Sequence, residues 1–443
     1  MTTRAIIVRH GQSTYNAQSL IQGRCDESVL TEKGRQDAQT VGATLAPVPV
    51  DAIYHSPLQR AAQTAAIIHE HCADVPMQAS DRLMEIDLPL WEKLHKKAVA
   101  EQFAEDYRCW KTRPHEFYMT LPDGRKHYPV LSLYEQAQAF WQELLARHSG
   151  QTVMIVAHNG INRCLMMSAV GMSCDRYHTI QQSNCCINIL NFSGGGGDSV
   201  QIESLNQTAH MGVKLPPPRP PQTKLRLLLV RHGETDWNRE SRFQGSRDIP
   251  LNDNGRKQAQ KAADFLADVH LDFAVSSPML RPKETAEIII QSHLDIPLSV
   301  EPQFAEIGHG LWEGKLEQEI EDAFPGLLAQ WKAQPETVQM PEGENLQQVW
   351  DRAIAAWNAL VAKMSASDTP QVGLVVAHDA INKVILCYLL GLQPANFWNI
   401  KQGNGAVSVI DYPKGADGYP VLQAINITSH LGGILDRTAA GAL

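Results

Sequence analysis

The sequence lacks the features of a membrane protein and of a protein that binds nucleic acid. No uninterrupted apolar run approaches the roughly 20 residues that a membrane-spanning helix needs. The formal net charge is −9, so no excess of positive charge favours nucleic acid or an anionic membrane as a partner. These absences favour a globular protein with a small-molecule partner, and the net charge still allows a local basic pocket for a small anion.

Cysteine and metal-ligand patterns are also missing. None of the eight cysteines belongs to a Cys-x-x-Cys pair, and the first half holds seven of them, which is not the distribution of a disulfide framework. We therefore expect reduced thiols and a cytoplasmic protein, and the lack of a signal-like segment before the first apolar stretch supports this. The sequence contains no His-Glu-x-x-His and no spaced carboxylate cluster, so we expect no metal and no cofactor.

The sequence does contain a long internal repeat. The stretch "AIIVRHGQSTYN" (5–16) returns as "LLLVRHGETDWN" (227–238). The separation of matching residues is 222 at His10 and His232 and still 220 at His158 and His378, which indicates a duplicated domain. Five prolines in 214–224 indicate a stiff linker. We predict an N-terminal domain 1–213, a proline-rich linker 214–224 and a C-terminal domain 225–443.

Strand-like and helix-like segments alternate in each half. Apolar runs without polar alternation predict buried strands of parallel type, at Ala5–Val8, Ala52–His55, Val153–Ala157, Ile187–Phe192, Leu227–Val230, Phe273–Ser276, Leu374–Ala377 and Val407–Tyr412. Segments such as Lys33–Leu45 and Ser277–Ile290 have helical periodicity. We predict two tandem α/β domains, each a three-layer α/β/α sandwich, with ligands bound at the carboxyl ends of the strands.

Five chemically useful residues recur in the same order in both halves. They are Arg9, His10, Arg60, Glu85 and His158, and then Arg231, His232, Arg281, Glu306 and His378. Arginine forks match tetrahedral oxyanions, a neutral imidazole is a competent nucleophile, and a protonated carboxyl group can protonate a leaving alkoxide. Each residue alone would be an ordinary surface or strand-end side chain. Their joint recurrence favours metal-free phosphoryl transfer through a phosphohistidine.

These motifs resemble the histidine phosphatase superfamily, also called phosphoglycerate mutase-like. The matching segments are Arg-His-Gly, "SPLQRAAQTA" and "SPMLRPKETA", "LMEIDLPLWEK" and "FAEIGHGLWEG", and "VAHNG" and "VAHDA". The resemblance implies nucleophiles His10 and His232 and proton donors Glu85 and Glu306. It implies phosphate pockets formed by Arg9, Arg60 and His158 and by Arg231, Arg281 and His378. It further implies phosphate contacts from Asn16 and Asn238 and pocket-edge loops at Gln22-Gly23 and Gln244-Gly245.

The resemblance covers both phosphatases and mutases. The mutases carry Gly-Trp in the loop that reads "FQGSRDIPL" here, and they tend to carry a longer insertion before the second histidine. We therefore expect a phosphoric monoester hydrolase that acts on a small phosphorylated metabolite. Phosphoserine, sugar phosphates and 2-carboxyarabinitol 1-phosphate are the substrates that the resemblance implies. A phosphoglycerate mutase is the alternative.

A different alternative is one active domain beside a domain that only binds a phosphometabolite. The first copy reads "EIDLPLWEK" where the second has the glycine-rich "EIGHGLWEG", and we expect a single charged helix in the following 93–117. In the second copy, "MPEGENLQQVWDR" (340–352) is similar to the family's helix start. We expect a differently shaped mouth in the first domain and no loss of a catalytic group. The sequence is compatible with a homodimer and with a monomer.

Overall fold

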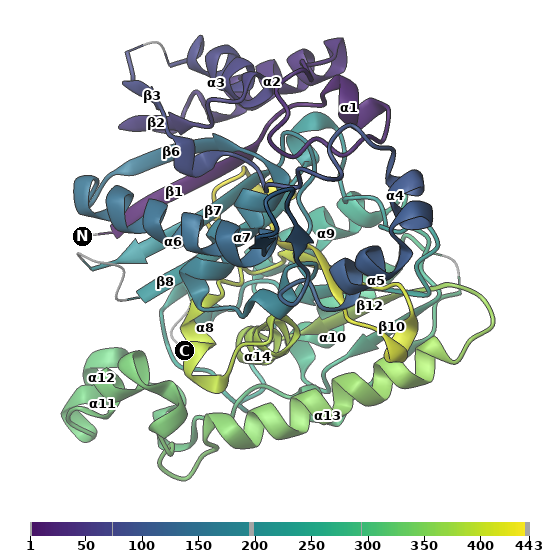
Figure 1. Cartoon of the computed structure of the whole chain (residues 1–443). Coiled ribbons are helices and arrows are strands. Elements are labelled where there is room, and N and C mark those ends of the chain that lie inside the picture. The colour runs from purple at the N-terminus through teal and green to yellow at the C-terminus, as the bar shows by residue number, and fades with distance from the viewer. Residues whose placement is uncertain (1, 73, 195–198, 294, 439–443) are drawn as a thin grey trace. The chain divides into compact units, whose positions relative to one another are not determined.

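The computed structural model describes residues 2–72, 74–194, 199–293 and 295–438. It divides into two compact units, Met1–Pro216 and Pro217–Leu443 (Figure 1). Residues 195–198 of the glycine run that follows the last predicted strand of the first half lie outside the described residues.

The first unit is built on a mixed sheet in which the first strand is central. Strand β1 (Thr2–Arg9) pairs in parallel with β6 (Thr152–Ala157), which continues in parallel through β2 (Ala52–His55) to β3 (Met77–Ala79). On its other side β1 pairs antiparallel with β7 (Ile187–Ser193), and β7 pairs antiparallel with β8 (Ser199–Gln207). The carboxyl ends of β1, β6 and β2 therefore lie along one edge of the sheet.

The second unit repeats this arrangement. Strand β9 (Leu225–Arg231) pairs in parallel with β12 (Gln371–Ala377), which continues through β10 (Phe273–Ser276) to β11 (Leu298–Val300). On the other side β9 pairs antiparallel with β13 (Val407–Tyr412), and β13 pairs with β14 (Val421–Ile427). The prediction of parallel-type strands was wrong for Ile187–Phe192 and Val407–Tyr412. A continuous apolar run records burial on both faces, and an antiparallel strand buried on both faces has the same pattern.

Helices cover both faces of each sheet. The side chains of Ala5, Ile6, Ile7 and Val8 are all fully buried, and because alternate side chains of a strand point to opposite faces, both faces must be covered. The cover in the first unit includes the packed helix pairs α2 (Glu32–Leu45) with α3 (Gln59–His69) and α6 (Pro129–Arg147) with α7 (Asn159–Val170) (Figure 1). In the second unit it includes α9 (Asp253–Leu266) with α10 (Leu280–Ile290) and α13 (Leu346–Ser365) with α14 (Asp379–Leu390). The α/β sandwich prediction is confirmed.

The helices of the first unit are α1 (Thr14–Ala17), α2 (Glu32–Leu45), α3 (Gln59–His69), α4 (Lys96–Gln102), α5 (Ala104–Thr112), α6 (Pro129–Arg147) and α7 (Asn159–Val170). Those of the second are α8 (Asp236–Arg239), α9 (Asp253–Leu266), α10 (Leu280–Ile290), α11 (Glu317–Ala323), α12 (Leu327–Ala333), α13 (Leu346–Ser365) and α14 (Asp379–Leu390). In the described part of the chain, none of these helices is both long and apolar enough to cross a membrane.

Two helix predictions differ from the structure. The helix expected at Ser277 begins at Leu280, because the backbone N–H of Ser277 still bonds to Val376 O in the neighbouring strand. The single charged helix expected in 93–117 is two short helices, α4 and α5, which meet at Phe103 in a non-helical conformation. The first unit also has a small hairpin, β4 (Met119–Thr120) and β5 (Lys126–His127), and the His127 ring bonds to Asp87 O in the acid-containing loop.

Candidate active sites

The first histidine of each unit follows the central strand, and the glycine after it lies close against the backbone of a second glycine. The backbone N–H of His10 still bonds to Ala157 O at 2.9 Å, and that of His232 bonds to Ala377 O at 3.1 Å. A Cβ atom on Gly11 would lie only 2.3 Å from Gly34 O. Glycine is therefore required at this position, because any side chain would collide with backbone.

The first histidine has the same hydrogen bond in both units. His10 Nδ1 lies 2.7 Å from Gly11 O, and His232 Nδ1 lies 2.7 Å from Gly233 O. A carbonyl oxygen can only accept, so Nδ1 carries the proton and Nε2 keeps its lone pair. Arg281 Nε donates to His232 Nε2 at 3.3 Å, which agrees with this tautomer. The nitrogen with nucleophilic character is therefore Nε2.

The second histidine packs against the first. The ring centroids of His10 and His158 are 5.1 Å apart, and those of His232 and His378 are 5.2 Å apart. A serine hydroxyl lies near Nε2 of each second histidine, Ser56 Oγ at 2.7 Å from His158 and Ser277 Oγ at 2.8 Å from His378. Among the described residues, Nδ1 of each second histidine has no hydrogen-bond partner, so this atom is available to a ligand.

All four histidines are held neutral. Burial lowers the pKa of His10 well below its usual value, and the charges of Arg9 and Arg60 lower it further. Burial, with Arg281 and Arg231, lowers the pKa of His232 in the same way. The pKa values of His158 and His378 are lowered by burial and then by Arg60 and Arg281 respectively. Each site therefore presents uncharged imidazole rings beside permanent positive charges.

Two buried arginines lie beside each histidine pair. Arg60 donates to Gly23 O at 2.9 Å and to Cys25 O at 3.0 Å, and Arg281 donates to Gly245 O at 3.0 Å and to Arg247 O at 2.9 Å. These bonds attach the pocket-edge loop to the arginine. The other arginine of each pair donates to a glutamine carbonyl, Arg9 to Gln182 O at 2.8 Å and Arg231 to Gln402 O at 2.6 Å.

The remaining predicted residues join the same hydrogen-bonded loop. Asn16 Oδ1 accepts from Ser13 and from Asn184 Nδ2, and Asn238 Oδ1 accepts from Thr235 and from Asn404 Nδ2. Gln22 Oε1 accepts from the Ser13 hydroxyl at 2.9 Å, and Gln244 Oε1 accepts from the Thr235 hydroxyl at 2.9 Å. The Ser13 hydroxyl therefore connects Asn16 with Gln22, and the Thr235 hydroxyl connects Asn238 with Gln244 in the same way.

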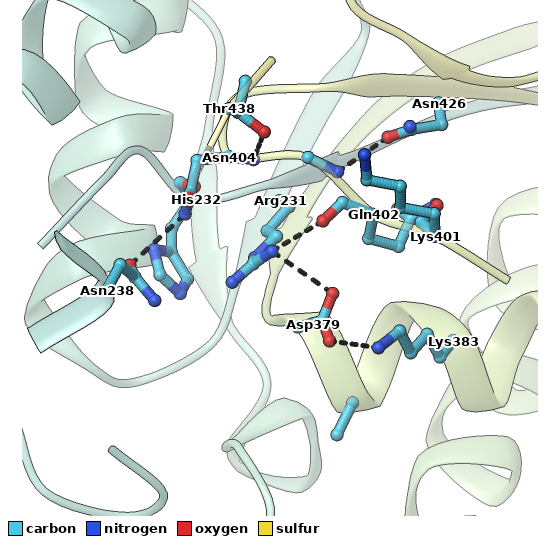
Figure 2. A network of polar contacts seen from close by, with 12 residues as sticks. Arg231, His232, Asn238, Asp379, Lys383, Lys401, Gln402, Asn404, Asn426 and Thr438 are labelled. Carbon is cyan, nitrogen blue, oxygen red and sulfur yellow. Dashed lines mark hydrogen bonds and ion pairs between the residues drawn. The ribbon is translucent and has the colours of Figure 1, made fainter. Parts of the chain in front are cut away.

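The supporting residues of this loop were absent from the sequence prediction. Asn404 Nδ2 donates to His232 O at 3.2 Å as well as to Asn238, and Figure 2 shows how it lies beside both. Asn184 Nδ2 bonds to His10 O at 2.9 Å in the first unit. Both asparagines recur at the duplication spacing, in "QQSNCC" and "KQGNGA", and that recurrence is the signal that could have found them.

The two acid residues have different surroundings. Glu85 accepts from the backbone N–H groups of Ile86, Gly160 and Ile161, at the N-terminus of α7. Glu306 accepts at 3.1 Å from Ile307 N and at 3.3 Å from Ala380 N, at the N-terminus of α14. Burial raises the pKa of Glu306, and the nearby carboxylate of Asp379 raises it further. A raised pKa favours the protonated form that a proton donor needs.

Asp379 is the main charge difference between the two sites. Its carboxylate is buried and lies 3.3 Å from Arg231 Nη1 and 2.6 Å from Lys383 Nζ (Figure 2). The first unit has Asn159 at this position. The second site thus contains one more buried negative charge immediately after its second histidine.

The loop that carries the acid is held by different arginines in the two units. In the first, Arg24 donates to Glu85 O at 3.2 Å and to Gln136 Oε1 at 2.9 Å. In the second, Arg352 of α13 donates to Glu306 O at 3.2 Å and pairs with Glu344 at 2.8 Å. Glu344 also accepts from Gly308 N at 2.8 Å. Glu344, in the segment before α13 that is similar to the family's helix start, therefore holds the acid loop in place through Gly308 and Arg352.

A buried histidine without partners lies in the acid loop of the second unit. His309 is fully buried against Phe243, Trp312 and Trp331, and neither ring nitrogen has a hydrogen-bond partner among the described residues. Burial lowers its pKa to about 3. The first copy has the apolar Leu88 at this position.

We expect His309→Leu to stabilise the second unit. At neutral pH the gain is about 1–3 kcal/mol, because a buried polar ring without partners is replaced by an apolar side chain. The gain is larger at pH 5, since the unfolded chain takes up a proton below about 6.5 whereas folded His309 does so only near 3. Urea unfolding at pH 7.5 and pH 5 measures both effects. The exposed His270, changed to Leu, is the control and should give neither gain, and a loss of stability in His309→Leu would contradict the assignment.

The fold and the sites together define a tandem α/β protein with two neutral histidines and two buried arginines at the strand ends of each unit. The chain belongs to the histidine phosphatase superfamily (branch 1), whose family model matches residues 5–206 and 227–428. The family prediction is confirmed.

Curated relatives match either the whole chain or one unit. The chain is 33% identical to the 2-carboxy-D-arabinitol-1-phosphatase of Triticum aestivum, over 97% of this chain and 86% of the wheat protein. It is 30% identical to the probable 2-carboxy-D-arabinitol-1-phosphatase of Arabidopsis thaliana, over 97% of this chain and 88% of that protein. Phosphoserine phosphatase 1 of Hydrogenobacter thermophilus is 33% identical, over 47% of this chain and 95% of its own length.

Proposed function

We propose that the protein is a metal-independent phosphatase of small phosphorylated metabolites that works through a phosphohistidine, chiefly in its second domain. The observation that carries the proposal is the pair of neutral histidines packed ring to ring beside two buried arginines. The relatives named as phosphatases support hydrolysis as the reaction.

In the proposed reaction, His232 Nε2 attacks the phosphorus atom and the bond to the leaving oxygen breaks. Arg231 and Arg281 neutralise the charge on the phosphoryl oxygens, and His378 Nδ1 faces the same group. Glu306 gives its proton to the leaving oxygen. Water then attacks the phosphohistidine and gives a proton to the Glu306 carboxylate, and the bond from phosphorus to Nε2 breaks, which releases phosphate and restores the imidazole and the protonated acid. His10, Arg9, Arg60, His158 and Glu85 have the same roles in the first site.

We further propose that the substrate carries a carboxylate beside its phosphate ester. The named substrates of the relatives, 2-carboxy-D-arabinitol 1-phosphate, phosphoserine and glucosyl-3-phosphoglycerate, share this feature.

We also propose the domain bounds 1–213 and 225–443. They are supported by the division between the compact units, which falls inside the linker 214–224. A cytoplasmic location agrees with the eight free thiols.

Matched substrate pairs test the activity and the carboxylate together. We expect phosphate release from phosphoserine and 3-phosphoglycerate to exceed, by kcat/KM, the release from phosphoethanolamine and glycerol 3-phosphate. Turnover should be unchanged by a chelator. Loss of turnover with chelator and its recovery with Mg²⁺ would rule out the metal-free mechanism. Isomerisation of 3-phosphoglycerate without phosphate release would establish a mutase instead.

Asp379→Asn tests the electrostatic role of the carboxylate next to His378. Because Asp379 raises the pKa of Glu306, its neutralisation should lower that pKa and move the alkaline limb of the pH–kcat profile to lower pH. The profile is measured in the His10→Ala background, so that only the second site reports. Asn159→Asp, made in the His232→Ala background, is the reciprocal variant. An alkaline limb that does not move would assign it to another group.

A further inference from the structure

The second unit contains a cavity away from the histidine pair. It has a volume of about 220 Å³ and lies between α9 and the segment 431–438. A water molecule takes up about 30 Å³ of liquid, so the space holds roughly seven waters or a phosphate group with a small organic part. All of its lining residues belong to the second unit.

The cavity wall is rich in positive charge. Lys257 and Lys261 lie four residues apart on α9 and therefore share one helix face, and Arg437 lines the cavity from the C-terminal segment. Within the part of the chain that the structure describes, none of the three has an ion-pair partner. All three residues are exposed at the mouth of the cavity, which is partly open to solvent. Three cations around one cavity favour an anionic occupant.

Among the described residues of the wall, Glu234 is the one acid, and its carboxylate already has hydrogen-bond partners. Glu234 Oε1 accepts from Arg239 at 3.0 Å and from Asn252 at 2.9 Å, and Oε2 accepts from Asn254 at 3.1 Å. Arg239, Asn252 and Asn254 therefore take up the hydrogen-bonding capacity of the Glu234 carboxylate. The lysines and Arg437 therefore keep their charge for a ligand.

The positive set is confined to the second copy. At the positions of Lys257 and Lys261 the first copy has Gln36 and Thr40, and the position that matches Arg437 lies beyond the first unit, at Pro217 in the linker. Both halves thus keep the histidines, arginines and glutamate of the active site. Lys257, Lys261 and Arg437 are present only in the second half. A role shared with the catalytic residues does not explain this distribution, whereas a separate ligand does.

Two hydrogen-bonded connections join the cavity wall to the nucleophile. On one side, Gln258 Oε1 accepts from Glu234 N at 2.8 Å, two residues beyond His232. On the other, Asn404 N donates to Thr438 Oγ1 at 3.1 Å, and Asn404 Nδ2 donates to His232 O (Figure 2). A ligand that draws α9 and the C-terminal segment together would therefore restrain the backbone of His232 from both sides.

We propose that this cavity is a second anion site, for a phosphate dianion that is either free or part of a small metabolite, and that its occupation supports the His232 site. The ligand lies between Lys257, Lys261 and Arg437 and holds Thr438 against Asn404. The binding part of the proposal is independent of the proposed phosphatase activity, and only the coupling to His232 rests on it.

Equilibrium dialysis of the full chain with labelled inorganic phosphate tests the site without any turnover. We expect Lys257→Ala/Lys261→Ala to bind one phosphate fewer per chain than the parent protein, whatever number the two catalytic pockets hold. Lys283→Ala/Lys363→Ala removes the same charge from exposed positions outside the cavity and should bind as the parent does. Arg437→Gln is the second variant if the double variant is unstable. Equal binding by parent and cavity variants would overturn the site.

The source of the phosphate group and the coupling are measured separately. Displacement of labelled phosphate from the cavity by methylphosphonate more strongly than by unlabelled phosphate identifies a substituted phosphoryl group, and the reverse order identifies free phosphate. In the His10→Ala background at saturating substrate, phosphate should raise kcat, and the rise should vanish in Lys257→Ala/Lys261→Ala. A kcat that phosphate leaves unchanged, or changes equally in both proteins, would overturn the coupling.

Discussion

In the His10→Ala background, where only the second site reports, His232→Ala should lower turnover by about 10³-fold or more, the range seen when a covalent nucleophile is removed. The two arginines of the second site cannot replace it, because a guanidinium group carries no lone pair to donate. Phosphate release from the best substrate of the matched panel measures the loss. Acid-labile ³²P on the protein, trapped during turnover, should disappear in the same variant.

His10→Ala is the matched variant for this prediction. The same atom is removed from the same position of the first unit, and we expect most of the turnover to remain. The comparison requires both variants to keep the thermal transition of the parent protein, since both histidines are buried. Full activity in His232→Ala together with loss in His10→Ala would transfer the main activity to the first domain.

Glu306→Gln should lower kcat by about 10²–10⁴-fold for esters with a poor leaving group, the usual contribution of a general acid. An alkoxide leaving group needs the proton of Glu306, whereas p-nitrophenolate leaves without one. The loss should therefore be small with p-nitrophenyl phosphate. The amide keeps the size of the side chain and can still accept from Ile307 N, so the loop that carries it should keep its conformation.

The measurement is made in the His10→Ala background with phosphoserine and p-nitrophenyl phosphate. Glu287→Gln, on the exposed face of α10, controls for the loss of one carboxylate and should change neither rate. The alkaline limb of the pH–kcat profile should vanish with Glu306. Equal losses for the two substrates would mean that Glu306 orders the site and does not donate a proton.

Much of the fold followed from the sequence, and one error shows why the rest did not. The duplication, the positions of the eight predicted strands and the sandwich architecture were readable from apolar runs at repeated spacing, whereas short strands such as β3 and β11 were not predicted. The directions of β7 and β13 were not, because the hydrophobic pattern reports how many faces are buried and carries no information on direction.

The chemically reactive residues followed from the sequence more completely than their supports. The repeated histidines, arginines and glutamates are brought to one edge in each unit, as their order after the strands predicted. Asn184, Asn404 and the Ser56 and Ser277 hydroxyls were missed, although they recur at the same spacing. Their part in the site depends on which carbonyl or ring nitrogen lies within hydrogen-bond distance, and no local pattern states that.

The sequence by itself determined that this protein is a duplication and which functional groups each copy contains, since residue type and order are properties of the chain. Only the tertiary structure decided which differences between the copies change the surroundings of the sites. Asp379 matters because its carboxylate lies within ion-pair distance of Arg231 and Lys383. His309 matters because it is buried and its ring has no hydrogen-bond partner among the residues that the structure describes. Electrostatic interaction and desolvation depend on distance and burial, and folding fixes both.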